Sequence, residues 1–181
     1  MIVAVLDANV LFPMVLRDTL LRVAAAGCFR AQWSARILAE MTRNLVGDYG
    51  MDPPRAEALR TVMEEAFPDA SVEGWEEIEP HMRNDPKDRH VVAAAVAVKA
   101  TVIVTSNIRD FGSLPDGIVA LTPDEFLWQI FAKNPTEVLE AITVQAAAYR
   151  RPALTIRELI ERLALTSPGF AEQALEALDD R

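Results

Sequence analysis

Short apolar runs alternate with longer amphipathic stretches as far as about residue 132. Residues 2–6 (IVAVL) and 101–105 (TVIVT) are runs of strand length with apolar interiors, a pattern typical of strands buried on both faces. Residues 29–33 and 118–121 fit two further strands, and a fifth is expected near Trp75–Ile78.

Helices are expected between these strands, and several carry their own start or stop signals. Gly27 ends the first, Ser34 is placed as the N-cap of the second, and Thr122-Pro123-Asp124-Glu125 opens the last. The helix after Asp85 is rich in Ala and Val and should be deeply packed. The expected helices cover residues 13–26, 34–46, 53–67 and 87–99, and another begins at Thr122.

Alternation of strands and helices predicts an α/β fold in which helices cover both faces of a central parallel sheet, a three-layer arrangement. From residue 135 onward the pattern is helical only, with helices expected at about 136–149, 155–165 and 168–180. We therefore expect a domain over residues 1–132 and a C-terminal helical extension over residues 133–181.

Composition adds few constraints beyond a folded protein. The 181 residues are 51% hydrophobic and 25% charged, which is ordinary for a globular chain. The single cysteine, Cys28, excludes an intrachain disulfide and a cysteine-based zinc site, is expected in the core, and fits a reducing cytoplasm. The first apolar run ends at Asp7 without a basic leader, so we expect neither a signal peptide nor a membrane span.

The charge distribution limits how the chain could bind nucleic acid. A net charge of −9 argues against nonspecific attraction of a polyanion, so such a site must be local or be made by metal ions. Residues 1–50 hold five arginines against four acids, whereas residues 51–181 hold 13 basic and 23 acidic residues. A surface role is the simpler interpretation of each arginine, but these five could line an approach for RNA: Arg17, Arg22, Arg30, Arg36 and Arg43.

Two aspartates, Asp85 and Asp88, stand at the start of the Ala- and Val-rich helix in the sequence DPKDRHVVAAA. Helix-start chemistry explains both when the stretch is read alone. Asp85 would be the N-cap, Pro86 would occupy a position that needs no N–H donor, and Asp88 would be the acid of a capping box.

Four acids are nevertheless expected around one edge of the sheet. Asp7 directly follows the first strand, Asp110 lies just after residues 101–105, and Asp88 opens the helix that leads into that strand. Glu40 lies within the helix that starts at Ser34. Each has an ordinary alternative: a turn residue for Asp7 and Asp110, a cap for Asp88, and for Glu40 an ion pair with Arg36 and Arg43 on the surface.

Buried carboxylates gathered in one crevice repel one another unless a cation neutralises them. The ligands would be oxygens, and the chain has neither a cysteine cluster nor a histidine cluster. Such a set suits Mg²⁺ or Mn²⁺ better than zinc.

Four stretches, in their order and spacing, resemble the PIN-domain nucleases, and among them the VapC-like ribonuclease toxins of bacterial toxin–antitoxin pairs. The resemblance covers roughly residues 1–132, and the long third stretch is its most specific part. The stretches are LDANVL, ILAEMTRNL, DPKDRHVVAAAVAVKATVIVTSNIRDF and TPDEFL.

This resemblance implies a Mg²⁺- or Mn²⁺-dependent endoribonuclease that cleaves single-stranded or looped RNA and pairs with a cognate antitoxin. It neither requires nor excludes a homodimer. The implied catalytic and metal-holding acids are Asp7, Glu40, Asp88 and Asp110, and the implied supporting residues are Asn9, Thr105 and Asn107.

The chain departs from the family pattern at two positions. Ala8 stands where Thr or Ser is common, which removes a hydroxyl. Asn107 stands where some members have another Asp, which bears on the affinity for a second metal ion.

Three other interpretations were weighed. A catalytically silent PIN fold acting as a binding module is supported only by Asn107, and an aspartyl-phosphate phosphatase using Asp7 is weakened because Asn9 replaces its usual second Asp. A dinucleotide-binding domain lacks its glycine motif. His90, two positions after Asp88 and so on roughly the opposite side of the helix, is expected to be structural, and His81 carries no argument.

Overall fold

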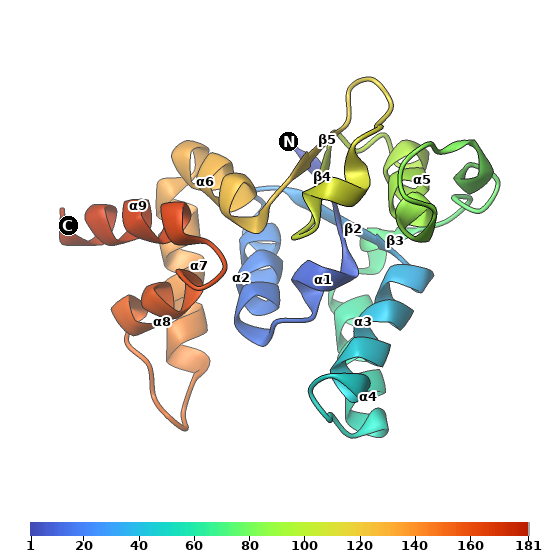
Figure 1. The fold of residues 1–181 in the computed structure, drawn as a ribbon. Coiled ribbons are helices and arrows are strands. Elements are labelled where there is room, and N and C mark those ends of the chain that lie inside the picture. Colours follow the sequence, from blue (N-terminus) through green and yellow to red (C-terminus); the bar gives the residue numbers. More distant parts are fainter. Residues whose placement is uncertain (181) are drawn as a thin grey trace.

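A computed structural model describes residues 1–180, which form a five-stranded sheet with the strand order β3-β2-β1-β4-β5 (Figure 1). Every pairing in the sheet is parallel. The α/β fold with a central parallel sheet is therefore confirmed. The strands are β1 (Val3–Leu6), β2 (Arg30–Ser34), β3 (Ser71–Val72), β4 (Val102–Val104) and β5 (Val119–Leu121).

The two most apolar runs of the sequence become the two neighbouring strands at the middle of the sheet. Leu6 at the end of β1 pairs in register with Val104 at the end of β4, and both side chains are fully buried. The backbone N–H of Asp7 donates to the carbonyl of Val104 at 3.0 Å, so the pairing continues one residue past β1. Residues that follow these two strands are thus brought to the same edge.

Helices lie on both sides of the sheet. The chain moves from β1 through β2 to β3 and then crosses back to β4, and right-handed crossovers along such a path place the connecting helices on opposite faces. In Figure 1, α5 lies on the other side of the sheet from α1 and α2. The helices of this part are α1 (Ala8–Leu11), α2 (Met14–Ala25), α3 (Ala35–Gly47), α4 (Pro53–Ala66) and α5 (Arg89–Ala97).

Local capping signals explain where several helices begin. The hydroxyl of Ser34 accepts the backbone N–H of Ile37 at 3.2 Å at the start of α3, as predicted. Thr122 and Glu125 form a reciprocal capping box at the start of α6 (Pro123–Lys133). The structure also confirms the predicted stop at Gly27, which has φ 80°, a backbone conformation that favours glycine.

Three local expectations were wrong. The third strand is Ser71–Val72, whereas residues 76–78 form a turn, because Trp75 packs into the core while the residues around it are polar. The expected helix over 87–99 is a 3₁₀ turn, Pro86–Asp88, followed by the shorter α5. Residues 8–11, where no helix was predicted, form the short helix α1, because a carboxylate oxygen of Asp7 accepts the N–H of Ala8 at 2.7 Å and caps it.

The C-terminal helices pack onto the rest of the molecule. The buried Gln145 of α7 accepts a hydrogen bond from the hydroxyl of Thr19 on α2 at 2.7 Å and donates one to the carbonyl of Val15 at 3.2 Å. Their apolar residues belong to the same core cluster as those of the sheet. The helices α7 (Pro135–Ala148), α8 (Ile156–Leu163) and α9 (Pro168–Asp179) confirm the helical extension.

A second link joins the extension to the helix after β5. The carboxylate of Asp124, in the first turn of α6, accepts the backbone N–H of Phe170 in the first turn of α9 at 2.8 Å. Gly169 lies beneath this carboxylate, and a Cβ there would meet Asp124 Oδ2 at 3.1 Å. The close approach therefore favours glycine at this position.

None of the helices within residues 1–180 is long and apolar enough to span a membrane.

Replacing Gln145 with Ala should lower the free energy of unfolding by about 1–3 kcal/mol, because both hydrogen bonds between its buried side chain and α2, to Thr19 and to the carbonyl of Val15, are lost. Urea unfolding of the full chain measures this change. Glu140→Ala, at an exposed position of the same helix, is the control and should change the free energy by less than about 0.5 kcal/mol. Equal stability of the two variants would show that the link between α2 and α7 contributes little.

Candidate active site

Asp7 is buried at the carboxyl end of β1, and all of its polar contacts are local to the end of the sheet. One carboxylate oxygen accepts the N–H of Ala8, and the other accepts the hydroxyl of Thr105 at 2.8 Å and the amide of Asn9 at 3.0 Å. Burial raises the pKa of Asp7, and the hydrogen bonds from Thr105 and Ala8 only partly oppose this effect.

Asn9 and Thr105 form a rigid polar frame that joins the end of β1 to the end of β4. The Thr105 hydroxyl donates to Asp7 and accepts from the amide of Asn9 at 3.1 Å and from the N–H of Asn107 at 3.1 Å. The side-chain carbonyl of Asn9 accepts the N–H of Ser106 at 3.0 Å. The frame therefore fixes the carboxylate of Asp7 and the start of the segment that carries Asp110.

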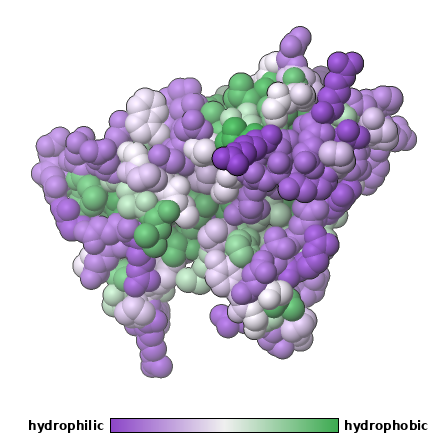
Figure 2. All heavy atoms as spheres, viewed as in Figure 1, coloured by the Kyte–Doolittle hydropathy of each residue, from purple (hydrophilic) through white to green (hydrophobic). Residues whose placement is uncertain are grey.

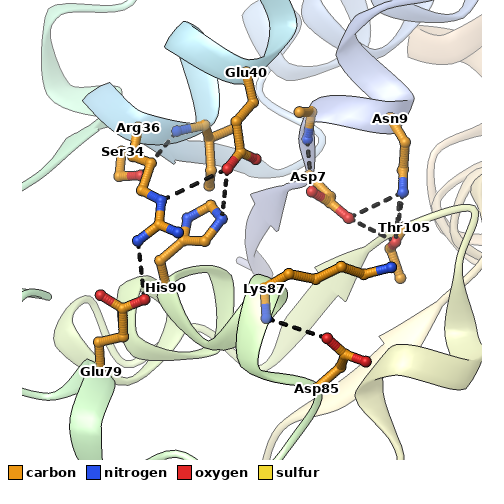
Figure 3. A network of polar contacts seen from close by, with 12 residues as sticks. Asp7, Asn9, Ser34, Arg36, Glu40, Glu79, Asp85, Lys87, His90 and Thr105 are labelled. Atoms are coloured by element: carbon orange, nitrogen blue, oxygen red, sulfur yellow. Dashed lines mark hydrogen bonds and ion pairs between the residues drawn. The ribbon is translucent and has the colours of Figure 1, made fainter.

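Asp85 and Asp88 differ in the structure. Asp85 accepts the backbone N–H of Lys87 at 3.1 Å and so caps the 3₁₀ turn, whereas Asp88 makes no capping hydrogen bond (Figure 3). Burial raises the pKa of Asp88 to about 7, helped by the charge of Asp7 and by a hydrogen bond with Asp110. Asp88 therefore interacts with Asp7 and Asp110 and does not cap the helix.

Lys87 holds Asp110 from the outside of the site. Its ammonium nitrogen lies 2.8 Å from Asp110 Oδ2, and the amide of Asn107 donates to the same carboxylate. The hydrogen bond from Lys87 lowers the pKa of Asp110, with further lowering by Asp88 and Asn107. Lys87 was not among the candidate residues predicted from the sequence. Its place between Asp85 and Asp88 was the available signal.

Glu40 lies on α3 beside this group and contacts basic side chains. Its Oε1 lies 3.1 Å from Nε2 of His90 and 3.6 Å from Nε of Arg36. Partial burial acts to raise the pKa of Glu40, but the contact with His90 and the charges of Arg36 and Arg43 outweigh it, so the pKa is lowered. The charge of Glu40 in turn helps to raise the pKa of Asp7, so the two acids lie within electrostatic range.

The structure thus brings Asp88 within electrostatic range of both Asp7 and Asp110, and it places Glu40 within range of Asp7. Of the partners of Glu40, Arg36 was named from the sequence, whereas His90 was missed. The available signal was a histidine within a helix of Ala and Val, because a buried imidazole needs a polar partner.

The donor chemistry of these four acids fits a divalent cation such as Mg²⁺ or Mn²⁺, which prefers carboxylate oxygens. The raised pKa of Asp88 reflects a surplus of negative charge that a cation would relieve. Within residues 1–180, however, no three or more His, Cys, Asp or Glu side chains gather into a ready-made metal cluster. In this structure Lys87 engages Asp110, and His90 engages Glu40.

The arginines proposed for RNA occupy different environments. Arg17 is buried and donates to the backbone carbonyls of Leu11 at 2.8 Å and Phe12 at 3.1 Å, which favours a structural role at the end of α1. Arg36 is engaged with Glu40 and with Glu79. Arg43 is exposed and close enough to Glu40 for its charge to lower the pKa of that acid.

The pKa of Asp88 predicts how stability depends on pH in the metal-free protein. Its folded value, about 7, lies above the value of about 3.9 for an unfolded aspartate, so the folded state binds more protons between these pH values. Stability should therefore fall as the pH rises through this window, and Asp88→Asn should reduce the fall by on the order of 1 kcal/mol, since Asp88 is only partly buried.

Urea unfolding with a chelator, at about pH 5 and about pH 8, measures this difference on either side of the shifted pKa. Asp116→Asn, in an exposed loop, is the control and should keep the pH dependence of the wild type. If Asp88→Asn also keeps the pH dependence of the wild type, the raised pKa of Asp88 is not its cause.

Comparison with known proteins agrees with this geometry. A family model described as "PIN domain" matches residues 3–109, and one described as "VapC50 C-terminal domain" matches residues 123–176. The second match begins within the stretch that we assigned to the first domain. No solved structure matches the chain.

The chain is also 36% identical over 104 residues to the curated "Putative ribonuclease VapC50" of Mycobacterium tuberculosis (strain ATCC 25618 / H37Rv). The alignment covers 56% of this chain and 62% of that protein, so the chain spans less than two thirds of the relative's length. The PIN-domain match alone extends over more than half of the chain, from β1 to the turn that carries Asp110. Together with the sheet order and the acids at its carboxyl edge, this match shows that the chain belongs to the PIN domain family.

Proposed function

We propose that this protein is a Mg²⁺- or Mn²⁺-dependent endoribonuclease that cleaves single-stranded or looped RNA. The observation that carries the proposal is the set of carboxylates at the carboxyl edge of the sheet, where Asp88 interacts with both Asp7 and Asp110 and the charge of Glu40 acts on Asp7. In open α/β sheets this edge is where ligands bind. The name of the curated relative, a ribonuclease, supports the same reaction class.

The side chains have distinct roles in this proposal. Asp7 is the most firmly held acid, because Ala8, Asn9 and Thr105 fix both of its oxygens. Asp88 contributes a carboxylate that helix capping does not use, and Asp110 completes the group from the turn after β4. A bound divalent ion supplies Lewis-acid activation of water and neutralises the phosphate charge.

RNA would approach an otherwise acidic protein through a local basic contact. Arg43 is better placed for RNA than Arg17 and Arg36, because it is exposed and lies near Glu40, whereas the other two are engaged with other groups of the protein. Single-stranded or looped RNA presents unstacked bases together with its backbone, whereas a double helix keeps its bases paired and stacked.

We further propose that the protein is the toxin of a toxin–antitoxin pair and acts in the cytoplasm. The match of residues 123–176 to the VapC50 C-terminal domain supports this, because it extends the likeness to VapC proteins beyond the nuclease core. The net charge of −9 favours an antitoxin that is at least partly basic and binds next to the active site.

The alternative is a catalytically silent PIN fold that acts as a binding module. Asn107 is the observation that favours it: its neutral amide occupies a position where some relatives have an acid, and here it donates to Asp110. Retention of Mn²⁺ binding by a protein that leaves structured RNAs intact would support this alternative.

Asp7→Asn and Asp88→Asn should each abolish metal-dependent cleavage, because each removes a charged oxygen ligand. Asp85→Asn is the matched control, since it changes only a cap and should cost about 1 kcal/mol of stability with cleavage retained. Gel analysis of a labelled looped RNA, with Mg²⁺ or with a chelator, measures this. Our assignment is wrong if Asp85→Asn abolishes cleavage and Asp88→Asn does not.

Arg43→Ala should raise KM for RNA and leave kcat nearly unchanged, because a phosphate contact is made equally in the ground state and the transition state. The dependence of log KM on log salt concentration should become less steep by about one phosphate contact. Arg162→Ala, on α8, is a comparison at another exposed arginine and should leave both quantities unchanged. If kcat falls and KM stays unchanged, Arg43 does not act as a phosphate contact that is equal in the ground state and the transition state.

A further inference from the structure

We propose that His90 and Arg36 are positioning residues: both hold Glu40 by a single carboxylate oxygen, Oε1, and so keep its other oxygen available to the metal site. This inference rests on the proposed function, because it assigns a purpose to the orientation of one of the proposed metal-binding acids. Neither His90 nor Arg36 takes part in the proposed reaction itself.

His90 is the buried imidazole of α5. It is 0% exposed, its Nε2 lies 3.1 Å from Glu40 Oε1, and its ring meets Trp75 edge-on at a centroid distance of 6.0 Å. The contact with Glu40 has the distance of an ion pair without the alignment of a hydrogen bond, and Nδ1 has no hydrogen-bond partner within residues 1–180. A buried polar ring without a polar partner costs free energy of folding. The contact with Glu40 therefore accounts for a histidine at this buried position.

Arg36 contacts the same oxygen from α3 itself. It lies one turn before Glu40 on α3, with Nε 3.6 Å from Oε1. Its other end is anchored, because NH1 lies 2.9 Å from Glu79 Oε1 and the guanidinium carbon lies 5.9 Å from the centre of the Trp75 ring. The anchored guanidinium can therefore hold Glu40 with little rotational freedom (Figure 3).

The second oxygen of Glu40 points the other way. Both polar contacts recorded for this carboxylate within residues 1–180 are made by Oε1. In Figure 3 the other oxygen lies on the side nearer to Asp7. The charge of Glu40 acts on the pKa of Asp7, which agrees with this direction. The side chain is 21% exposed, so water or an ion can reach it.

Two residues that hold Arg36 in place, Trp75 and Glu79, come from a segment that the proposed function leaves unused. Trp75, Glu79 and His90 lie between β3 and the first turn of α5, in and after the irregular segment that follows α4. Glu79 also belongs to an acidic stretch that would otherwise be taken for a solvated surface. Trp75 and Glu79 thus form an outer layer around Arg36, which in turn holds Glu40 of α3 next to the start of α5.

A purely structural role for His90 makes a different prediction. If the imidazole only filled the core, replacing it would change stability and leave metal binding alone. If it positions Glu40, an apolar replacement leaves the fold intact and weakens metal binding, because Glu40 is free to turn away. Outer-layer partners of metal ligands typically contribute 10–100-fold to affinity.

The test compares His90→Phe, which keeps bulk and removes the polar contact, with His90→Gln, which restores an amide donor. Calorimetric titration of the full chain with Mn²⁺, in the absence of RNA, measures the affinity. We expect His90→Phe and Arg36→Met to weaken binding by about 10-fold or more and His90→Gln to stay within about 3-fold of the wild type. His81→Phe, at an exposed histidine of the same segment, is the control and should bind as the wild type.

A crystal structure of metal-free His90→Phe provides a second measurement, in which the Glu40 carboxylate should be displaced from its position in the wild type. Unchanged or tighter Mn²⁺ binding by folded His90→Phe would overturn the inference while leaving the proposed function intact. If that variant does not fold, wild-type affinity in Arg36→Met would overturn it equally. Absence of Mn²⁺ binding by the wild type would overturn the proposed function and this inference together.

Discussion

The hydrogen bond between Thr105 and Asp7 is the contact on which the rest of the site depends. It exists because β1 and β4 are neighbours in register, so that the residues following Leu6 and Val104 meet at one edge of the sheet. The strands meet because both are apolar on both faces and can be buried only in the middle of a covered sheet. Burial of the apolar strands β1 and β4 therefore determines the position of the Asp7 carboxylate. This carboxylate then determines what this edge of the sheet can bind.

The site is held in balance by charges of both signs. Burial and, after it, the charge of Asp7 raise the pKa of Asp88 to about 7, while Lys87 and His90 engage the other two acids. The protein thus tolerates four acids near one another by giving each a different environment. In Figure 2 the hydrophobic parts of the visible face are separated by hydrophilic regions.

The sequence was enough to predict the sheet, most helices and the strand-end acids, because long apolar runs, capping residues and Gly27 each act within a few residues. It also separated the capping role of Asp85 from the different role of Asp88. It could not predict the two-residue strand at Ser71, which depends on pairing with a distant strand, nor the contact between His90 and Glu40. That contact joins residues far apart in the chain, and no local pattern records which face of α3 meets α5.

Asp124 and Gly169 show how the C-terminal helices became part of the nuclease fold. A carboxylate in the first turn of one helix supplies the N-terminal cap that the other helix does not make for itself, and the glycine lets the two backbones approach. The pair is therefore a compact docking signature. In other PIN-domain sequences, an acid just after the capping threonine and a Pro-Gly start about 45 residues later, the spacing from Asp124 to Gly169 here, would mark chains whose tail folds back in the same way.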